Sequence, residues 1–377
     1  MRASYIESHP IMSTRKPKKV DIVCESLKKR IINNVWKVGN HIPTELELAE
    51  EFQCSRGTIS KAIARLEGLN LLEGRKRGGT RVTSNTIKQS ASAVDLEAFA
   101  FVFPNERHEG IRRMVRGFQE AAYAHGRSVM MLTTGTELRK ETEIISSLPD
   151  YNVRGCVTSP VLSTVSGQLQ FSQIVMASEI PIVLAGMALP GTGCPSVTAD
   201  FFHEGYTVTN HLIKQGLKRI GFLANHAWTQ IAREKHLGYR KALEEAGIPY
   251  NSSLVHLAPQ MNPSHEHPLR EPARIAQNYL KQATDLEGVV CLYDFLAVAL
   301  IETARAMNIR VPEDLKIIGI DDIAIANSTQ VSLTTYHVPF EAIGQQAFTL
   351  LNSLVNGTPL DNTDVQIRGE LIIRQSA

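Results

Sequence analysis

Polar side chains follow several short apolar runs after residue 96, at the points where β-strands would end. They are Ser159, Asp200, Asn225, Asp294 and Asp321 with Asp322. Carboxylate and amide oxygens accept hydrogen bonds well, so a set of them suits a ligand that carries many hydroxyl groups. Taken singly, each residue is equally well explained as the N-cap of a helix that follows its strand. A binding site for a polyhydroxylated small molecule and a series of helix caps are therefore the two alternatives.

A second group of chemically active residues lies near the N-terminus. After Ser55, apolar residues recur at the spacing of one helix face, at Ile59, Ala62, Ile63 and Leu66. The opposite face is small, polar and cationic: Gly57, Ser60, Lys61 and Ala64, with Arg56 in the first turn. Such a face lets a helix backbone approach the major groove of DNA closely.

The elements that would position this helix are also visible in the sequence. Residues 20–33 carry apolar side chains at helical spacing, which predicts a first helix. Thr44 and Glu47 have the spacing of a capping box, which predicts that a second helix begins there. Two short helices joined by three or four residues form a helix-turn-helix.

A glycine-rich basic turn between two short strands follows, over residues 71–82. Its cations are Arg75, Lys76, Arg77 and Arg81. A hairpin after a helix-turn-helix makes a winged helix, in which Arg77 and Arg81 would reach the DNA backbone or minor groove. Considered alone, the hairpin is equally compatible with an ordinary basic surface turn.

The charge distribution supports a nucleic-acid partner for this region only. Residues 1–84 hold 16 Lys and Arg against 9 Asp and Glu, a net charge of +7, whereas the whole 377-residue chain has +2. A strong basic bias in one part of a chain indicates a nucleic-acid partner for that part. The alternative is a solvated basic face with no partner.

The rest of the chain predicts an α/β fold. Residues 85–95 are small, polar and unpatterned, as in an interdomain linker. From residue 96 to 377, apolar strands alternate with helices, which favours parallel sheets covered on both faces. About 280 residues exceed one core, so we expect two lobes. The predicted domains are a winged helix-turn-helix at 18–84, a linker at 85–95, and a two-lobed sensor and dimerisation domain at 96–377.

Several function classes find no support in the residues. No P-loop, dinucleotide fingerprint or nucleophile elbow occurs, so catalysis and a bound cofactor are not expected. His265, Glu266 and His267 lie in a loop rich in proline and asparagine, and a surface loop and a metal site are the alternatives there. The five scattered cysteines indicate reduced thiols. Neither a secretory leader nor a membrane span is evident, so we expect a cytoplasmic protein.

The N-terminal unit resembles the GntR-type winged helices. Three of its segments are similar to that family's motifs. Residues 42–49 (IPTELELA) correspond to LPTE-x-x-LA, residues 54–59 (CSRGTI) to VSR-x-TV, and residues 78–82 (GGTRV) to G-x-GT-x-V. The resemblance covers about residues 18–84. It implies contacts with a double-stranded DNA operator from Glu45, Ser55, Arg56, Gly57, Thr58 and the wing residues Gly78, Gly79, Thr80 and Arg81. The family has Arg where this chain has Ser60, so Lys61 is the candidate for that base contact.

The sensor resembles that of the LacI/GalR repressors, a periplasmic binding protein-like fold. Five of its segments follow that family's motifs in order. They are residues 212–216 (LIKQG), 238–243 (GYRKAL), 311–315 (VPEDL), 318–322 (IGIDD) and 333–335 (LTT). A GntR-type reader on this sensor is the arrangement of the arabinose-repressor group, whose ending residues 370–377 (ELIIRQSA) resemble.

The resemblance implies a ligand-responsive transcriptional regulator, in the first place a homodimeric repressor of carbohydrate-utilisation genes. Its implied effector residues are Ser159, Lys235, Asp294 and Asp321, and Arg107 is added from its position after the first strand. The resemblance implies a sugar or related molecule as the effector. Because Lys235 stands where the family has a sugar-clamping Arg, arabinose itself does not follow. The alternative is a small-molecule binding protein or an enzyme whose N-terminal module is incidental.

Overall fold

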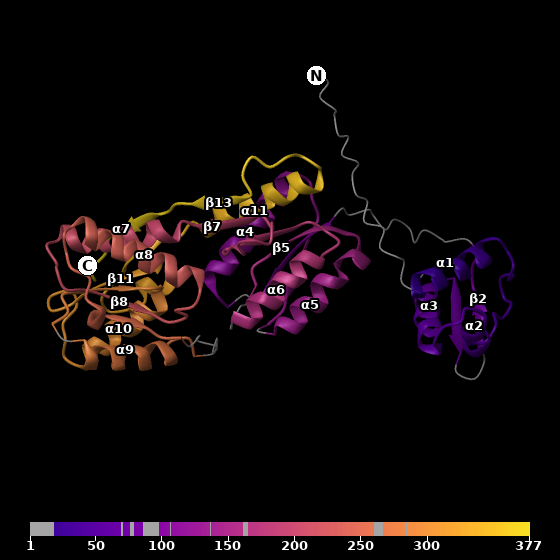
Figure 1. Ribbon diagram of the computed structural model, residues 1–377, viewed down its shortest axis with the longest axis horizontal. Coiled ribbons are helices and arrows are strands. Elements are labelled where there is room, and N and C mark those ends of the chain that lie inside the picture. The colour runs from indigo at the N-terminus through magenta and orange to yellow at the C-terminus, as the bar shows by residue number, and fades with distance from the viewer. Residues whose placement is uncertain are drawn as a thin grey trace, which may run out of the picture. The chain divides into compact units, whose positions relative to one another are not determined.

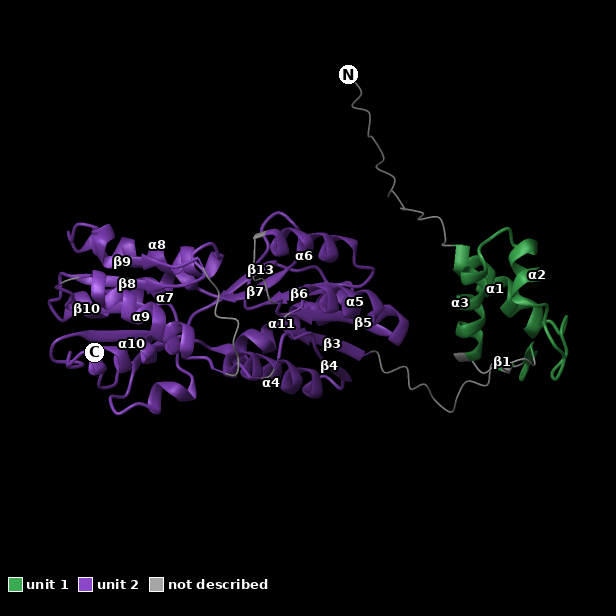
Figure 2. Cartoon of the chain, turned by 90° about the horizontal axis from the view of Figure 1, so that it is seen from below, with its two compact units in different colours: residues 1–95 green, residues 96–377 purple. Residues whose placement is uncertain are grey.

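The computed structural model describes residues 19–68, 71–75, 79–85, 98–105, 107–135, 137–160, 165–259, 267–283 and 285–377. It divides into two compact units, Met1–Asp95 and Leu96–Ala377 (Figure 2). No helix in the part of the chain so described is long and apolar enough to cross a membrane.

The first unit is a winged helix. Its elements are α1 (Lys19–Ile32), α2 (Glu45–Glu51), α3 (Arg56–Gly68), β1 (Leu72–Arg75) and β2 (Gly79–Val82). The strands pair antiparallel, with Glu73 opposite Arg81. Leu27 of α1 and Ile59 and Leu66 of α3 are fully buried in one hydrophobic core, which also contains Leu48 of α2. The apolar stripes predicted for these helices therefore form the core of the unit.

The second unit has two lobes, each a six-stranded sheet between helices (Figure 1). The N lobe contains β3 (Ala98–Phe103), β4 (Val129–Thr133), β5 (Val153–Thr158), β6 (Ile182–Ala185), β7 (Ser196–Ala199) and β13 (Asp364–Ile367), in the order β13-β7-β6-β5-β3-β4. All neighbouring pairs of this sheet are parallel.

Helices cover both faces of the N-lobe sheet. They are α4 (Glu109–Ala124), α5 (Leu138–Ser147), α6 (Val165–Ala177) and α11 (Phe340–Val355), with a short 3-10 turn at Leu148–Tyr151. Every residue of β3 is buried, because alternate side chains face α4 with α11 on one side and α5 with α6 on the other. Phe101, for example, makes an edge contact with Phe118 of α4.

The C lobe repeats this architecture. Its strands are β8 (Ile220–Ala224), β9 (Val255–Leu257), β10 (Gly288–Cys291), β11 (Lys316–Asp321), β12 (Thr334–His337) and β14 (Glu370–Ile372), in the order β14-β12-β11-β10-β8-β9. Only β14 pairs antiparallel among these described strands. The helices are α7 (Phe201–Lys214), α8 (Gln230–Glu245), α9 (Arg270–Gln282) and α10 (Asp294–Ala306), with 3-10 turns at Ser252–Leu254 and Ala324–Asn327.

The chain joins the lobes by passing between them three times, from β7 to α7, from β12 to α11 and from β13 to β14. Within the C lobe, helices α7 and α8 approach closely at Gly205 and Gly238, where an added Cβ would lie about 2.0 Å from a backbone oxygen of the facing helix. A two-lobed α/β unit and a winged helix in one chain confirm the predicted fold class.

Candidate functional site

The exposed face of α3 carries the residues predicted to read DNA. Ser55, Arg56, Gly57, Ser60 and Lys61 are exposed, and Thr58 is half-buried. The opposite face of the helix is packed into the core, so this face is available to a partner. The polypeptide adopts no left-handed conformation at Gly57, and an added Cβ there would meet only the Ser55 hydroxyl at 3.9 Å.

Side-chain caps fix where both helices of this motif begin. The Ser55 hydroxyl accepts a hydrogen bond from the Thr58 backbone N–H at 3.2 Å. Thr44 and Glu47 form the predicted capping box at the start of α2. The hydrogen bond from the Thr44 backbone N–H lowers the pKa of Glu47, so this carboxylate is ionised at neutral pH. The helix starts are therefore held by local hydrogen bonds in addition to the core.

The structure brings two of the predicted DNA-binding residues together. Arg56 Nε donates to Glu45 Oε2 at 2.7 Å, which ties the first turn of α3 to the first turn of α2. The Arg56 side chain is nevertheless 73% exposed. An exposed ion pair contributes little to stability, so this guanidinium can exchange its partner at low cost.

The wing residues lie on β2. Arg81 donates two hydrogen bonds to the Glu73 carboxylate, at 2.9 Å from Nε and 2.6 Å from Nη2. The Thr80 carbonyl accepts from Ile42 N, and Gly79 has a positive φ of 69°. Arg77 and Gly78 were predicted to contact DNA and lie outside the described residues.

In the sensor, Asp294 is fully buried at the start of α10. Its carboxylate accepts hydrogen bonds from Thr335 Oγ1 at 2.6 Å and from Ile323 N at 3.0 Å. Burial raises its pKa to about 6. Both oxygens thus have protein donors, and the side chain holds the segment after β11 against β12.

Asp321 differs from Asp294 in its surroundings. It ends β11, is 8% exposed, and has a φ of 136°. Among the residues that the structure describes, none donates a hydrogen bond to its carboxylate. Burial raises its pKa well above the ordinary value, and the nearby charges of Asp294 and Glu204 act in the same direction, opposed by Lys235 and Arg113.

The charge of Lys235 acts on this carboxylate, but the ammonium has protein partners of its own. Its Nζ is 3.0 Å from Glu204 Oε2 and donates to the Leu292 carbonyl at 3.1 Å. Both side chains of the ion pair are at most 5% exposed. The charges of Lys235, Asp294 and Glu204 all act on Asp321, so the structure groups three of the predicted effector residues and adds Glu204 to them.

The loop after β8 contributes polar and aromatic groups to the same edge of the sheet. Asn225 is fully buried and its Nδ2 donates to the Tyr293 hydroxyl at 2.8 Å. Tyr293 stacks on His226 with ring centroids 6.2 Å apart, and burial lowers the pKa of His226 to about 4, so that ring is neutral. Trp228 of this loop packs against the hydrophobic cluster of the N lobe, so the loop faces that lobe.

The predicted N-lobe residues lie after strands as expected. Ser159 follows β5 and its backbone N–H donates to Val102 O at 3.0 Å. Arg107 is exposed after β3, and its backbone N–H donates to the Asn105 side chain. Among the described residues, these contacts of Ser159 and Arg107 lie within the N lobe, so neither residue is bonded to the C-lobe group.

Sequence reasoning missed two residues that connect this region. Glu204 lies one turn into α7 and partners Lys235. Arg113 of α4 donates to Glu341 at 2.9 Å and to the backbone oxygens of Asp322 and Val338 at 3.3 Å, so it links an N-lobe helix to two chain segments of the other lobe. In the sequence, Glu204 and Arg113 are charged residues beside the apolar stripe of a predicted helix. That pattern does not show which residues they contact.

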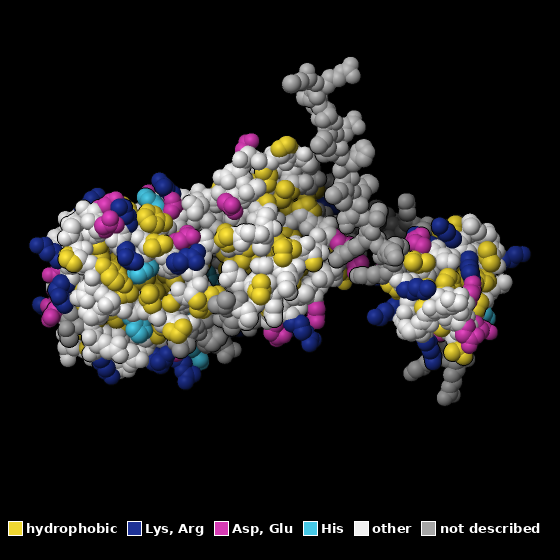
Figure 3. Space-filling model, in the orientation of Figure 1, with side chains coloured by type: hydrophobic (Ala, Val, Ile, Leu, Met, Phe, Trp, Pro, Cys, Tyr) yellow, Lys and Arg dark blue, Asp and Glu magenta, His cyan; other side chains and the backbone are white. Residues whose placement is uncertain are grey.

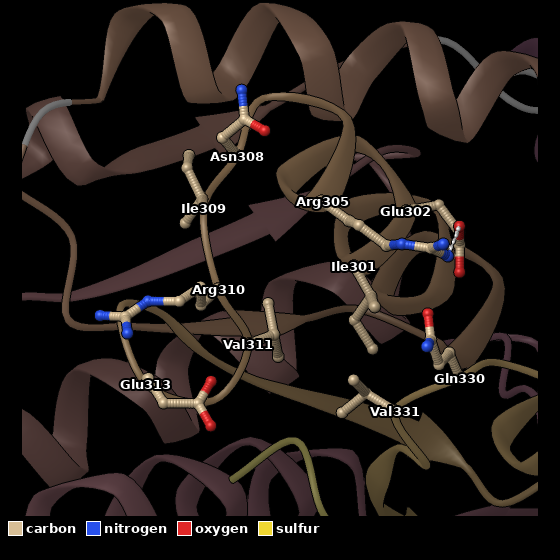
Figure 4. A pocket seen from close by; sticks show the side chains of 10 residues that line it. All are labelled: Ile301, Glu302, Arg305, Asn308, Ile309, Arg310, Val311, Glu313, Gln330 and Val331. Atoms are coloured by element: carbon tan, nitrogen blue, oxygen red, sulfur yellow. Dashed lines mark ion pairs between the residues drawn. The ribbon is translucent and has the colours of Figure 1, made fainter.

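A cavity of about 390 Å³ lies elsewhere in the C lobe (Figure 4). Ile301, Ile309, Val311 and Val331 form apolar parts of its wall, and Arg305 lies 3.6 Å from Glu302 at its edge. None of the predicted effector residues lines it. A second cavity, of about 750 Å³, lies beside Tyr239 and Tyr250 and is equally separate from them.

Two family models match the chain. The model for bacterial regulatory proteins of the gntR family matches residues 19–82, and the model for the periplasmic binding protein-like domain matches residues 209–377. These matches confirm both resemblances that the sequence motifs indicated.

Known proteins also match along most of the chain. The arabinose metabolism transcriptional repressor of Geobacillus stearothermophilus is 27% identical over 92% of this chain and 94% of its own. The transcription regulator CcpA of Lactococcus lactis has a similar fold, with a TM-score of 0.65, 22% identity, and coverage of 74% of this chain and 98% of that one. A transcriptional regulator CelR–cellobiose complex gives a TM-score of 0.66 and 20% identity over 96% of this chain and 100% of that one. These relatives are regulators rather than enzymes.

Proposed function

Because the chain is a DNA-binding transcriptional regulator that joins a gntR-type reader to a periplasmic binding protein-like sensor, we propose that it represses carbohydrate-utilisation genes and is relieved by a sugar-like effector. It acts in the cytoplasm, where the DNA of a bacterial cell lies. The effector binds at the edge of the C-lobe sheet that faces the N lobe.

One observation carries the effector proposal. The described residues supply no hydrogen-bond donor to the carboxylate of Asp321, which is 8% exposed, and the buried Asn225 Oδ1 nearby also lacks one. A hydroxyl group of a sugar donates to such acceptors, and buried acceptors without donors are costly. Asp321 would contact the effector directly. Asp294 and Lys235 would position Asp321, through the Ile323 segment and the Leu292 carbonyl. Ser159 and Arg107 would contribute to effector binding from the N lobe.

The reader would use α3 in the major groove and the wing on the backbone. Arg56 is the proposed base-reading residue, supported by Glu45, Ser55, Gly57 and Thr58 in the turns around it. Ser60 and Lys61 lie one turn further along the same exposed face. Gly79, Thr80 and Arg81 would contact phosphates or the minor groove, as would Arg77 and Gly78, which precede them in the sequence.

The protein would bind its operator as a homodimer. Helix α6 contains no charged residue, and its Leu169 and Met176 are 67% and 63% exposed. Figure 3 shows hydrophobic side chains and few charges over this part of the N lobe. A second copy would bury such a surface, and two readers would then match half-sites about 34–36 Å apart or a multiple of it.

Two measurements test this function. A thermal-shift screen against neutral, amino and acidic sugars should raise the melting temperature with at least one of them, because a ligand that binds only the native state stabilises it. Light scattering of the protein on DNA should give two chains per operator. Melting temperatures that no sugar changes would reject the effector class, and a monomer on DNA would reject the dimer.

A further inference from the structure

The buried polar atoms without a protein partner along the C-lobe edge are acceptors. Within the described part of the chain, no group donates to the buried atoms Asn225 Oδ1, Gln230 Oε1 and Glu204 Oε1. No described residue donates to the carboxylate of Asp321 either, which is 8% exposed. Gln230 Nε2 donates to Glu234 at 2.8 Å, which fixes the orientation of that amide. A molecule that supplies donors therefore gains more here than one that supplies acceptors.

The nearby cations are already neutralised. Glu204 lies 3.0 Å from the Lys235 ammonium, in an ion pair that is almost completely buried. Arg113 is bonded to the Glu341 carboxylate at 2.9 Å. Each of these cations has a carboxylate partner other than Asp321, so neither offers an uncompensated positive charge to a ligand.

Two carboxylates in this region have no such cation. Asp294 is bonded only to neutral donors, and no described residue donates to Asp321. A buried negative charge without a partner is unfavourable, and burial accordingly raises the pKa of Asp321. A positive charge from outside the chain would stabilise its ionised form, whereas an acidic sugar or a phosphate would meet charge of its own sign.

We propose that the effector carries an amino group, as an amino sugar or a similar amine-bearing polyol does, and that its ammonium lies beside Asp321. An ammonium has three donors and no acceptor, which fits a region with unpaired acceptors. Its hydrogen bond to a carboxylate is charge-assisted, roughly twice as strong as a neutral one. This inference rests on the proposed binding of a sugar-like effector at the same edge of the sheet.

Isothermal titration calorimetry of the full chain tests the proposal with matched sugars. The probes are glucose, glucosamine and N-acetylglucosamine, and the corresponding galactose series. Each N-acetyl sugar keeps the nitrogen and removes its charge. We expect the free amine of at least one series to bind about tenfold more tightly than both neutral members, as a charge-assisted bond replaces a neutral one. A neutral sugar that binds as tightly as its amine would overturn the inference and leave a sugar-responsive regulator intact. Binding of no member would overturn both.

Substitutions test whether Asp321 is the source of the preference. In Asp321→Asn, which keeps the shape and removes the charge, the amine and its parent sugar should bind with similar affinity. Asn225→Asp adds a carboxylate to which the Tyr293 hydroxyl can donate, and it should increase the preference for the amine. Asp314→Asn is the matched control, because Asp314 is exposed and paired with Arg310 elsewhere in the lobe. An unchanged preference in both site variants would overturn the assignment.

Discussion

Replacing Arg56 with alanine should weaken operator binding strongly and leave the fold intact. The free side chain is 73% exposed and bonded to Glu45 at 2.7 Å, so the loss of this ion pair should cost at most about 1 kcal/mol of stability. On DNA the same guanidinium would contact a base edge, and a contact of that kind is worth about 1–3 kcal/mol, or roughly 5- to 150-fold in affinity.

Fluorescence anisotropy with an operator selected from random duplexes measures the effect. Arg65→Ala is the matched control: it removes one cation from the same helix, but Arg65 is bonded to Asp21 of α1 at 2.7 Å. Arg81→Ala should instead weaken specific and random DNA alike and lower the slope of log affinity against log salt by about one. Arg56→Ala binding at the wild-type level across salt concentrations would refute the assigned reading face.

Three further predictions concern stability. Asp294→Ala should lower the unfolding free energy of the sensor by about 2–5 kcal/mol in denaturant titrations, because Thr335 and a backbone N–H lose their buried acceptor. Thr44→Ala should lower that of the reader by about 0.5–2 kcal/mol, seen by calorimetry as loss of the capping box. The buried carboxyl group of Glu141 accepts a hydrogen bond from Thr158, and burial raises its pKa from 4.5 to about 7. The folded protein therefore holds this proton more tightly than the unfolded chain does, so the free energy of unfolding falls as the pH rises from 4.5 through about 7. Glu141→Gln should match the wild type near pH 4 and exceed it at pH 8 by at most about 3 kcal/mol in denaturant melts.

Elements that depend on local patterns could be predicted from the sequence. The apolar stripe of α3 and the capping box at Thr44 are local signals, and both occur where expected. The continuous apolar run of β3 likewise corresponds to a strand buried on both faces. The two-lobed fold class followed from the alternation of such segments and from the chain length.

Elements and contacts without a local signal could not be predicted. Helix α6 has no charged residue and hence no clear polar face, so its helical period is weak. The two donors to Asp294 lie 29 and 41 residues further along the chain. The pairing of Lys235 with Glu204 depends on how α7 packs against α8. Residue types at strand ends therefore located the candidate site, but the separation of Asp321 from Asp294 required the tertiary contacts.

In the proposed mechanism, a sugar-like effector in the sensor controls the affinity of the reader for DNA. The most direct test is to titrate the selected operator with the full chain, with and without the sugar that raises its melting temperature most. We predict that this sugar lowers operator affinity by roughly 5- to 150-fold in the wild type and that Asp321→Ala, while still binding DNA, does not respond. An operator affinity that stays constant in the wild type while the same sugar stabilises the protein would contradict the claim.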